Sequence, residues 1–252
     1  MTRYRLYSDL AYLWPVISPP EEYAEEAVYW RRALRDRLGS GKHHILELGV
    51  GGGHLLSHLT PAHLTLGFQA TAVDISPQML ELSKRLNPGV DHYLGDMRTF
   101  RLGRTFDAVL IHDAIGYMLT ESDLSATFLA ARDHLRPEGV LLVAPEWVRE
   151  SFANDRTFNW VRKKGDLEVS IQEYLHDPDP EDTQVESIFS YEIREKGHLR
   201  REQDIHTTGL FPIATWTRLM EEAGFRVETL KIPANEGGYG EYLFLGVLPA
   251  PS

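Results

Sequence analysis

The chain has 252 residues, 42% hydrophobic and 25% charged, which is typical of a globular protein but exceeds the usual size of one domain. The net charge of −11 and the lack of a long Lys/Arg run argue against nucleic-acid binding, and no apolar run approaches the roughly 20 residues that span a membrane. The absence of cysteine excludes disulfides and thiolate metal sites, and it fits a cytoplasmic location.

The first 23 residues are rich in aromatic side chains, including Tyr4, Tyr7, Tyr12 and Trp14. This composition is not typical of a disordered tail, so we expect the segment to fold over the rest of the protein as a lid. A stripe of apolar residues from 27 to 38, ended by Gly39, predicts a helix directly after it.

Residues 43–145 alternate short apolar runs with helical patterns, which predicts a parallel sheet wound with helices. Strands are expected at 44–48, 70–74, 91–94, 106–111 and 140–144. One helix begins at Ser76, an N-cap followed by proline, and another begins at Thr120, with Asp123 three residues on. The segment 137–139 predicts a turn into the fifth strand.

The interval 146–211 has a different pattern. Residues 167–174 and 185–193 alternate with period two, and a Pro/Asp-rich stretch at 176–182 joins them, so we expect an antiparallel hairpin. We interpret the interval as a β-rich subdomain inserted over the substrate. Residues 1–145 and 212–252 then form the main domain, with a helix near 216–223 and strands at 225–230 and 242–247. The fold class is α/β, a doubly wound, mostly parallel sheet with an antiparallel insertion.

A glycine-rich turn follows the first strand, at Gly49, Gly51 and Gly53. Open α/β sheets bind nucleotides at such turns, although the turn also suits a tight connection alone. Asp74 ends the second strand and is placed to accept hydrogen bonds from ribose hydroxyls; the alternative is a charge at a helix N-terminus. Asp96 follows the third strand, where it is placed to bond an adenine amino group or to lie in a solvated turn.

The dinucleotide fingerprint does not match this turn. His54 stands where the third glycine of G-x-G-x-x-G belongs, and Glu47 lies two residues before the first glycine. Both features disfavour NAD.

The motif Glu47-Leu-Gly-Val-Gly-Gly-Gly53, together with Asp74, Gly95-Asp-Met97 and Leu135-Arg-Pro-Glu-Gly139, resembles class I S-adenosylmethionine (SAM)-dependent methyltransferases. The resemblance implies a seven-stranded sheet whose last strand is antiparallel, with SAM as cofactor. It also implies a set of cofactor-binding residues, namely Tyr7, Tyr23, Glu47, Gly49, Val50, Gly51, Asp74, Ile75, Met79, Asp96, Met97 and His112.

The sequence is also similar to the N,N-dimethyltransferases of nucleotide-activated amino sugars, in residues 95–106, 115–117, 145–152, 206–211 and 244–249. This similarity implies that the N-terminal segment covers the cofactor and that a tyrosine in it reaches the methionine carboxylate. The sequence differs from those enzymes at Ile111-His-Asp-Ala114, where they carry an aromatic residue and serines.

Methyl transfer requires a nucleophile with a free lone pair, aligned with the donor, so a proton acceptor in the cleft is useful. The candidates are His112, Tyr117, Glu146 and His206. His112 is the preferred base or amine-orienting group, because an unperturbed histidine titrates near neutrality. Each candidate also has a structural interpretation: a locally bonded histidine for His112, a core aromatic for Tyr117, a surface loop for Glu146.

No metal site is expected. His198, Glu202 and His206 recur every four residues, but the surrounding pattern indicates a strand or sheet edge, and we interpret them as structural. His206 is instead a candidate to line the substrate pocket.

The leading hypothesis is a SAM-dependent methyltransferase acting on the N or O of a small polar metabolite, with a nucleotide-linked amino sugar as the most specific candidate. The alternatives are a nicotinamide-dependent oxidoreductase and a non-catalytic SAM-binding protein. The expected partner is a small-molecule acceptor, without nucleic acid or membrane, and the sequence is compatible with a homodimer.

Overall fold

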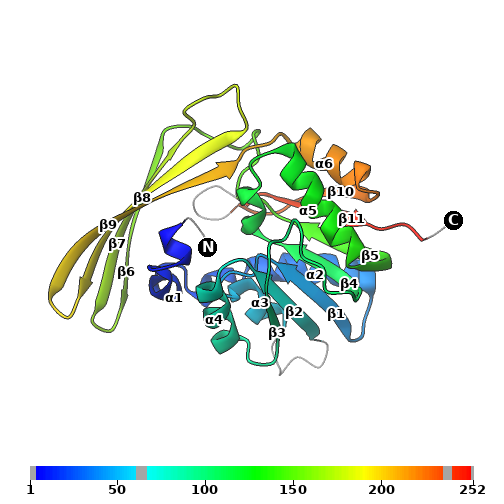
Figure 1. Ribbon diagram of the computed structural model, residues 1–252, viewed down its shortest axis with the longest axis horizontal. Coiled ribbons are helices and arrows are strands. Elements are labelled where there is room, and N and C mark those ends of the chain that lie inside the picture. The colour runs from blue at the N-terminus through cyan, green and yellow to red at the C-terminus, as the bar shows by residue number, and fades with distance from the viewer. Residues whose placement is uncertain (1–3, 61–66, 235–239, 251–252) are drawn as a thin grey trace.

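The computed structural model describes residues 4–60, 67–234 and 240–250. Its main body is a seven-stranded sheet with the strand order β10-β11-β5-β4-β1-β2-β3 (Figure 1). The strands are β1 (His43–Leu48), β2 (Phe68–Asp74), β3 (Asp91–Leu94), β4 (Phe106–Ile111), β5 (Leu135–Val143), β10 (Arg226–Lys231) and β11 (Tyr242–Val247). Strand β11 is antiparallel to both neighbours, and the pairs among β1 to β5 are parallel. The expected seven-stranded, mostly parallel sheet is confirmed.

Helices cover both faces of this sheet. They are α2 (Glu26–Leu38), α3 (His54–Leu59), α4 (Pro77–Leu86), α5 (Glu121–Asp133) and α6 (Ile213–Glu222), with a short 3-10 turn η4 (Asp113–Tyr117). Alternate residues along each strand point to opposite faces. In β4, Val109 and Ile111 pack with α5 and α6, whereas Ala108 and Leu110 pack with α2 and α3. None of the helices in the described ranges is long and apolar enough to cross a membrane.

The expected helix starts at Ser76 and Thr120 are present. The Ser76 hydroxyl accepts a hydrogen bond from the Met79 amide at 3.1 Å, and the Thr120 hydroxyl accepts one from the Asp123 amide at 3.1 Å. Each side chain satisfies a backbone donor that the first helical turn leaves unpaired.

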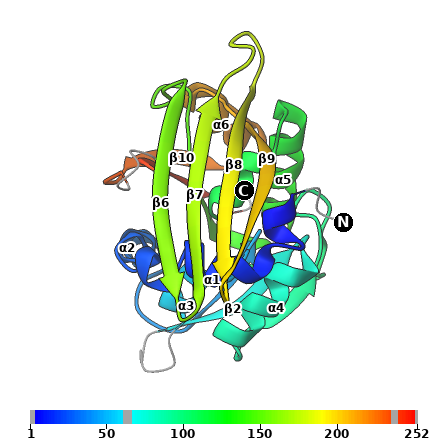
Figure 2. The same cartoon turned by 90° about the vertical axis from the view of Figure 1, so that its left-hand side faces the viewer.

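The inserted interval forms a separate four-stranded antiparallel sheet in the order β6-β7-β8-β9. Its strands are β6 (Arg156–Lys164), β7 (Leu167–His176), β8 (Gln184–Glu195) and β9 (His198–Gly209). The expected hairpin is the pair β7 and β8. Figure 1 shows this sheet beside the α/β body, and Figure 2 shows it face-on, in front of the body.

Two expectations need correction. The sequence did not predict β6, because the run of basic residues Arg162, Lys163 and Lys164 at its end obscures the alternation. The expected turn at 137–139 lies inside β5, which begins at Leu135. There the pairing with β4 jumps from Leu135 to Val140, so the extra residues form an irregularity in the strand rather than a loop before it.

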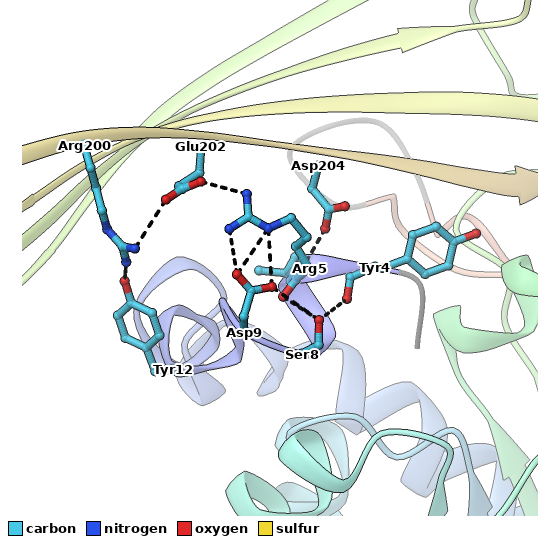
Figure 3. A network of polar contacts seen from close by, with 9 residues as sticks. Tyr4, Arg5, Ser8, Asp9, Tyr12, Arg200, Glu202 and Asp204 are labelled. Carbon is cyan, nitrogen blue, oxygen red and sulfur yellow. Dashed lines mark hydrogen bonds and ion pairs between the residues drawn. The ribbon is translucent and has the colours of Figure 1, made fainter. Parts of the chain in front are cut away.

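The N-terminal segment lies between the two sheets. It consists of short turns, η1 (Arg5–Tyr7), η2 (Ala11–Leu13), α1 (Trp14–Ile17) and η3 (Pro20–Tyr23). Leu10 and Leu13 pack against Val169 and Ile171 of β7. Figure 3 shows the polar contacts that add to this packing: Arg5 pairs with Glu202 at 2.7 Å, and Tyr12 contacts Arg200.

Candidate active site

A cavity of about 740 Å³ opens between the carboxyl ends of the parallel strands, the N-terminal segment and one face of the second sheet. All the candidate residues from the sequence line it: Tyr7, Tyr23, Glu47, Gly49, Val50, Gly51, Asp74, Ile75, Met79, Asp96, Met97, His112, Tyr117, Glu146 and His206. Strand ends and the two flanking segments therefore bring these distant residues to one site.

The glycine-rich loop is held tightly against the second strand. The Gly49 and Val50 amides both donate to the Val73 carbonyl, at 2.8 and 3.0 Å. Gly49 has a φ of 78°, and a Cβ there would collide with the side chain of Ala114. Glycine is therefore required at this position both for conformation and for space.

Asp74 at the end of β2 connects the loop to α4. Its carboxylate accepts hydrogen bonds from the Gly51 amide at 2.7 Å and the Ser76 amide at 2.8 Å. Burial raises the pKa of Asp74, while these amide bonds lower it. The contacts fix a carboxylate at the cavity wall with lone pairs left for a ligand.

Asp96 is engaged by Arg98, whose guanidinium donates to it at distances from 2.6 to 3.2 Å and also pairs with Asp123 at 2.7 Å. These hydrogen bonds from Arg98 hold the pKa of Asp96 below its ordinary value. Asp96 is thus held in an ion pair at the cavity wall, with its side chain 25% exposed.

Glu47 at the end of β1 is only 2% exposed, and its Oε2 has no hydrogen-bond partner. Burial raises the pKa of this carboxyl group to about 8, although the nearby charge of His112 lowers it. A buried carboxyl group without a partner is costly unless a ligand supplies a donor or a positive charge. Its position beside the glycine-rich loop therefore favours a cationic ligand group.

His112 after β4 lies among carboxylates. Its Nε2 is 2.8 Å from Glu26 Oε1 on α2, and its Nδ1 is 3.6 Å from Asp113 Oδ2. Burial alone would lower the pKa of His112, but the charges of Asp113 and Glu26 raise it to about 10. The ring is thus an imidazolium at neutral pH, with no lone pair to offer.

A chain of hydrogen bonds crosses the cavity from the N-terminal segment to β9. The Tyr7 and Tyr117 hydroxyls are 2.7 Å apart, and the Tyr117 hydroxyl is 2.8 Å from His206 Nδ1. His206 Nε2 is in turn 2.8 Å from Asp204 Oδ2. His206 and Asp204 are 2% and 6% exposed.

Two carboxyl groups from different parts of the chain line the cavity and interact electrostatically, Glu146 after β5 and Glu173 on β7. Burial and the charge of Glu173 together raise the pKa of Glu146 well above its ordinary value. Burial likewise raises the pKa of Glu173, against a hydrogen bond from Ser187. The pair therefore favours a bound proton or a cation.

Sequence reasoning missed most of the second-sheet wall, which includes Phe158, Arg162, Glu173, Ser187 and Phe189. The period-two pattern of β7 and β8 was visible and indicated which residues share a face. It did not indicate that this face turns toward the glycine-rich loop.

Comparisons with known proteins agree with this site. A methyltransferase domain family matches residues 45–139. A dTDP-3-amino-3,4,6-trideoxy-alpha-D-glucopyranose N,N-dimethyltransferase of Streptomyces venezuelae is 32% identical over 231 residues, which cover 90% of this chain and 92% of that protein. The chain belongs to the family of SAM-dependent methyltransferases. The methyltransferase therefore uses SAM as cofactor, and the nicotinamide-dependent alternative is set aside.

Further relatives share nearly the whole length of the methyltransferase. A dTDP-4-amino-2,3,4,6-tetradeoxy-D-glucose N,N-dimethyltransferase of Saccharopolyspora spinosa is 26% identical, over 90% of this chain and 86% of that protein. Among solved structures, DesVI of Streptomyces venezuelae superposes with a TM-score of 0.78 and 29% identity, covering 96% of both chains. The sugar N-methyltransferase KedS8 from Streptoalloteichus has a TM-score of 0.79 and 25% identity, covering 96% of this chain and 92% of that one.

The possible metal ligands on β9 are dispersed in the methyltransferase. His198 lies at the exposed start of the strand, Glu202 pairs with Arg5, and His206 is buried beside Tyr117. Within the described ranges, no group of three or more His, Cys, Asp or Glu side chains is arranged to hold a metal ion.

Proposed function

We propose that the methyltransferase transfers methyl groups from SAM to the amino nitrogen of a nucleotide-linked amino sugar. The observation that carries the proposal is the 32% identity, across nine-tenths of both chains, with a protein named for a dTDP-3-amino sugar. The cavity of about 740 Å³ lies within the range of small-molecule sites and has walls from both sheets. The net charge of −11 supports a small-molecule acceptor over a nucleic acid.

SAM is proposed to lie against the glycine-rich loop. In this position the carboxyl group of Glu47, whose Oε2 has no partner, would pair with the ammonium group of the methionine part. The carboxylate of Asp74 would accept hydrogen bonds from the ribose hydroxyls. Asp96 lies at the next strand end, where the adenine would follow, and Tyr7 and Tyr23 cover the site from the N-terminal segment. This arrangement fits SAM, because it places a buried carboxyl group at the ammonium group and a carboxylate at the ribose, beside the glycine-rich loop.

SAM supplies a methyl group on a sulfonium, already activated for displacement by a nucleophile with a free lone pair. The protein orients the acceptor nitrogen and removes its proton. Burial raises the pKa of Glu146 and of Glu173, and an approaching cationic amine favours the ionised form of a carboxyl group, so this pair is proposed to receive the amine. The hydroxyl groups of Tyr7 and Tyr117 provide polar contacts deeper in the same space.

The sequence favoured His112 as the base. We propose instead that His112 is a structural cation that holds neighbouring carboxylates in place. As an imidazolium bonded to Glu26, it cannot accept a proton. Its ion pair with Glu26 connects α2 to the end of β4, and its positive charge offsets the negative charges of Glu26 and Asp113.

We also propose a cytoplasmic location, which the absence of cysteine supports. A homodimer stays a prediction, and sedimentation of the purified protein would check it.

The test is a product assay with SAM and a panel of acceptors: dTDP-3-amino and dTDP-4-amino sugars, the same amino sugars without the nucleotide, and a dTDP sugar bearing only hydroxyl groups. Mass spectrometry should find added methyl groups on a dTDP-amino sugar, and much slower reaction without the nucleotide. Methylation of the hydroxyl-only sugar with no reaction of any amine would overturn the proposal.

A further inference from the structure

A buried chain of hydrogen bonds links Tyr117 at the cavity wall to His206 and Asp204 behind it. Asp204 and His206 lie on β9, outside the α/β body, and both are almost fully buried. Their polar atoms are paired in a line that ends at a tyrosine hydroxyl in the cavity wall. We propose that Asp204, His206 and Tyr117 form a proton relay that takes a proton from the acceptor ammonium. The proposal rests on the proposed function, in that the acceptor is an amine.

The charge of Asp204 determines where the protons of His206 lie. An ionised carboxylate accepts hydrogen bonds and donates none, so the 2.8 Å contact requires a proton on His206 Nε2. Hydrogen bonds from His206 and from the Leu6 amide, at 2.8 Å, hold the pKa of Asp204 below its ordinary value despite its burial. Asp204 is therefore ionised at neutral pH, and His206 Nδ1 faces the Tyr117 hydroxyl.

The same heavy-atom positions fit the chain both before and after it takes a proton. With a neutral imidazole, Tyr117 donates to His206 Nδ1 and its oxygen accepts from the Tyr7 hydroxyl. With an imidazolium, His206 Nδ1 donates to the Tyr117 oxygen, and Tyr117 donates elsewhere. Proton uptake therefore needs reorientation of hydroxyl hydrogens but no movement of side chains.

An N–H bond of the acceptor ammonium breaks, and its proton forms a new O–H bond on Tyr117. The original Tyr117 proton leaves that oxygen and forms an N–H bond at His206 Nδ1. The amine keeps the electron pair of the broken bond and would use it to attack the methyl carbon of SAM. An N–C bond would then form as the S–C bond breaks, and S-adenosylhomocysteine would leave with the electron pair of the S–C bond. Asp204 stabilises the imidazolium that results.

The relay passes through neutral tyrosine. Burial raises the pKa values of Tyr117 and Tyr7 well above the ordinary value, so neither rests as a tyrosinate at neutral pH. Tyr117 must receive one proton as it gives up another, which requires the 2.8 Å contact to His206. His112 is an imidazolium with no free lone pair, and His206 is the histidine whose ring nitrogen contacts the Tyr117 hydroxyl.

Other titratable groups lie close to this chain. The groups are Tyr4 and Tyr7 from the N-terminal segment, Tyr191 from β8, and Glu146, which interacts with both Tyr7 and Tyr117. Among these, Glu146 is the competing proton acceptor, so its variant belongs in the test.

The test compares Tyr117→Phe, His206→Asn and Glu146→Gln with the wild-type enzyme over a range of pH, with a dTDP-amino sugar and SAM. Below the pKa of the acceptor amine, Tyr117→Phe and His206→Asn should lower kcat about 100-fold or more. Above that pKa the amine is already neutral, so their deficit should shrink to within about tenfold. Tyr4→Phe is the matched control, since its ring contacts His206 but its hydroxyl donates to the Thr207 carbonyl; its pH profile should keep the wild-type shape.

A spectroscopic measurement keeps the relay testable apart from turnover. In protein with 15N-labelled histidine, the His206 ring should show a proton on Nε2, and Asp204→Asn should abolish this single tautomer. A deficit of equal size at all pH values, or a pH-dependent deficit only in Glu146→Gln, would overturn the relay. So would a His206 ring protonated only on Nδ1. If the wild-type enzyme methylates no amine, the proposed function fails, and the tautomer measurement still decides the geometry of the relay.

Discussion

The imidazole Nε2 of His112 lies 2.8 Å from Glu26 Oε1, which joins the helix before the first strand to the end of the fourth strand. Both side chains are 12% exposed. A histidine at this point of the sequence suggests a base, but the carboxylates around it make it a fixed cation. The site therefore contains a built-in positive charge beside the strand ends where the cofactor is proposed to bind.

His112 should make stability depend on pH. Its pKa is about 10 in the folded protein, against 6.5 for an unperturbed histidine, so the folded state binds its proton more tightly. The resulting stabilisation is fully present below about pH 6.5 and is lost as the pH rises through about 10. In urea unfolding, the free energies of unfolding of the wild type and of His112→Gln should differ most near about pH 6.5. A difference in the free energy of unfolding that grows as the pH rises from about 6.5 to about 10 would contradict the ion pair.

Asp74→Ala should weaken SAM binding at least about tenfold, because it removes the carboxylate proposed for the ribose and leaves the Gly51 and Ser76 amides without their acceptor. Isothermal titration calorimetry measures the change. Glu81→Ala, on the exposed side of α4, is the control and should bind SAM as the wild type does. Undiminished binding by Asp74→Ala would refute the ribose assignment.

SAM binding should release a proton from Glu47. With a pKa of about 8, this carboxyl group is mostly protonated near neutral pH, and an approaching ammonium favours its ionised form. Calorimetry at about pH 7 in buffers of different ionisation enthalpy should therefore detect release of close to one proton. Glu47→Gln should bind SAM more weakly and release almost none. If Glu47→Gln released as many protons as the wild type, the ammonium group of SAM would not lie at Glu47.

Leu10→Ala should loosen the N-terminal lid. Leu10 is 1% exposed and belongs to the cluster that packs the segment against β7 and β8. Loss of a buried leucine costs about 2–5 kcal/mol, and the cost falls on the docking of this short segment. SAM should then dissociate faster, and chymotrypsin should cut at the lid aromatics. Val28→Ala, at a residue 51% exposed, should change neither rate.

How much the sequence could predict differs between the two walls of the site. Gly49, Asp74 and Asp96 follow successive strands, and the carboxyl ends of parallel strands meet at one sheet edge, so local patterns suffice to bring them together. Glu173 and Asp204 lie on an inserted sheet. Their approach to the glycine-rich loop depends on how the inserted sheet packs on the leucines of the N-terminal segment. The periodicity of the sequence within a strand or helix does not indicate this packing.

His112 illustrates a second limit. His112 follows β4 and lines the cavity, but its charge depends on Glu26, 86 residues earlier in the chain. A pKa follows from neighbours in space, and those neighbours come from a different helix. For this reason the sequence favoured His112 as the base, whereas the contacts point to His206.

The most direct test of the central claim is a reaction with SAM labelled with 13C in the methyl group and a dTDP-3-amino sugar as acceptor. A correlation spectrum of the product should show the labelled methyl carbon bonded to the sugar nitrogen. A labelled carbon on a sugar oxygen, or no transfer to the amino sugar while another small molecule is methylated, would contradict the account.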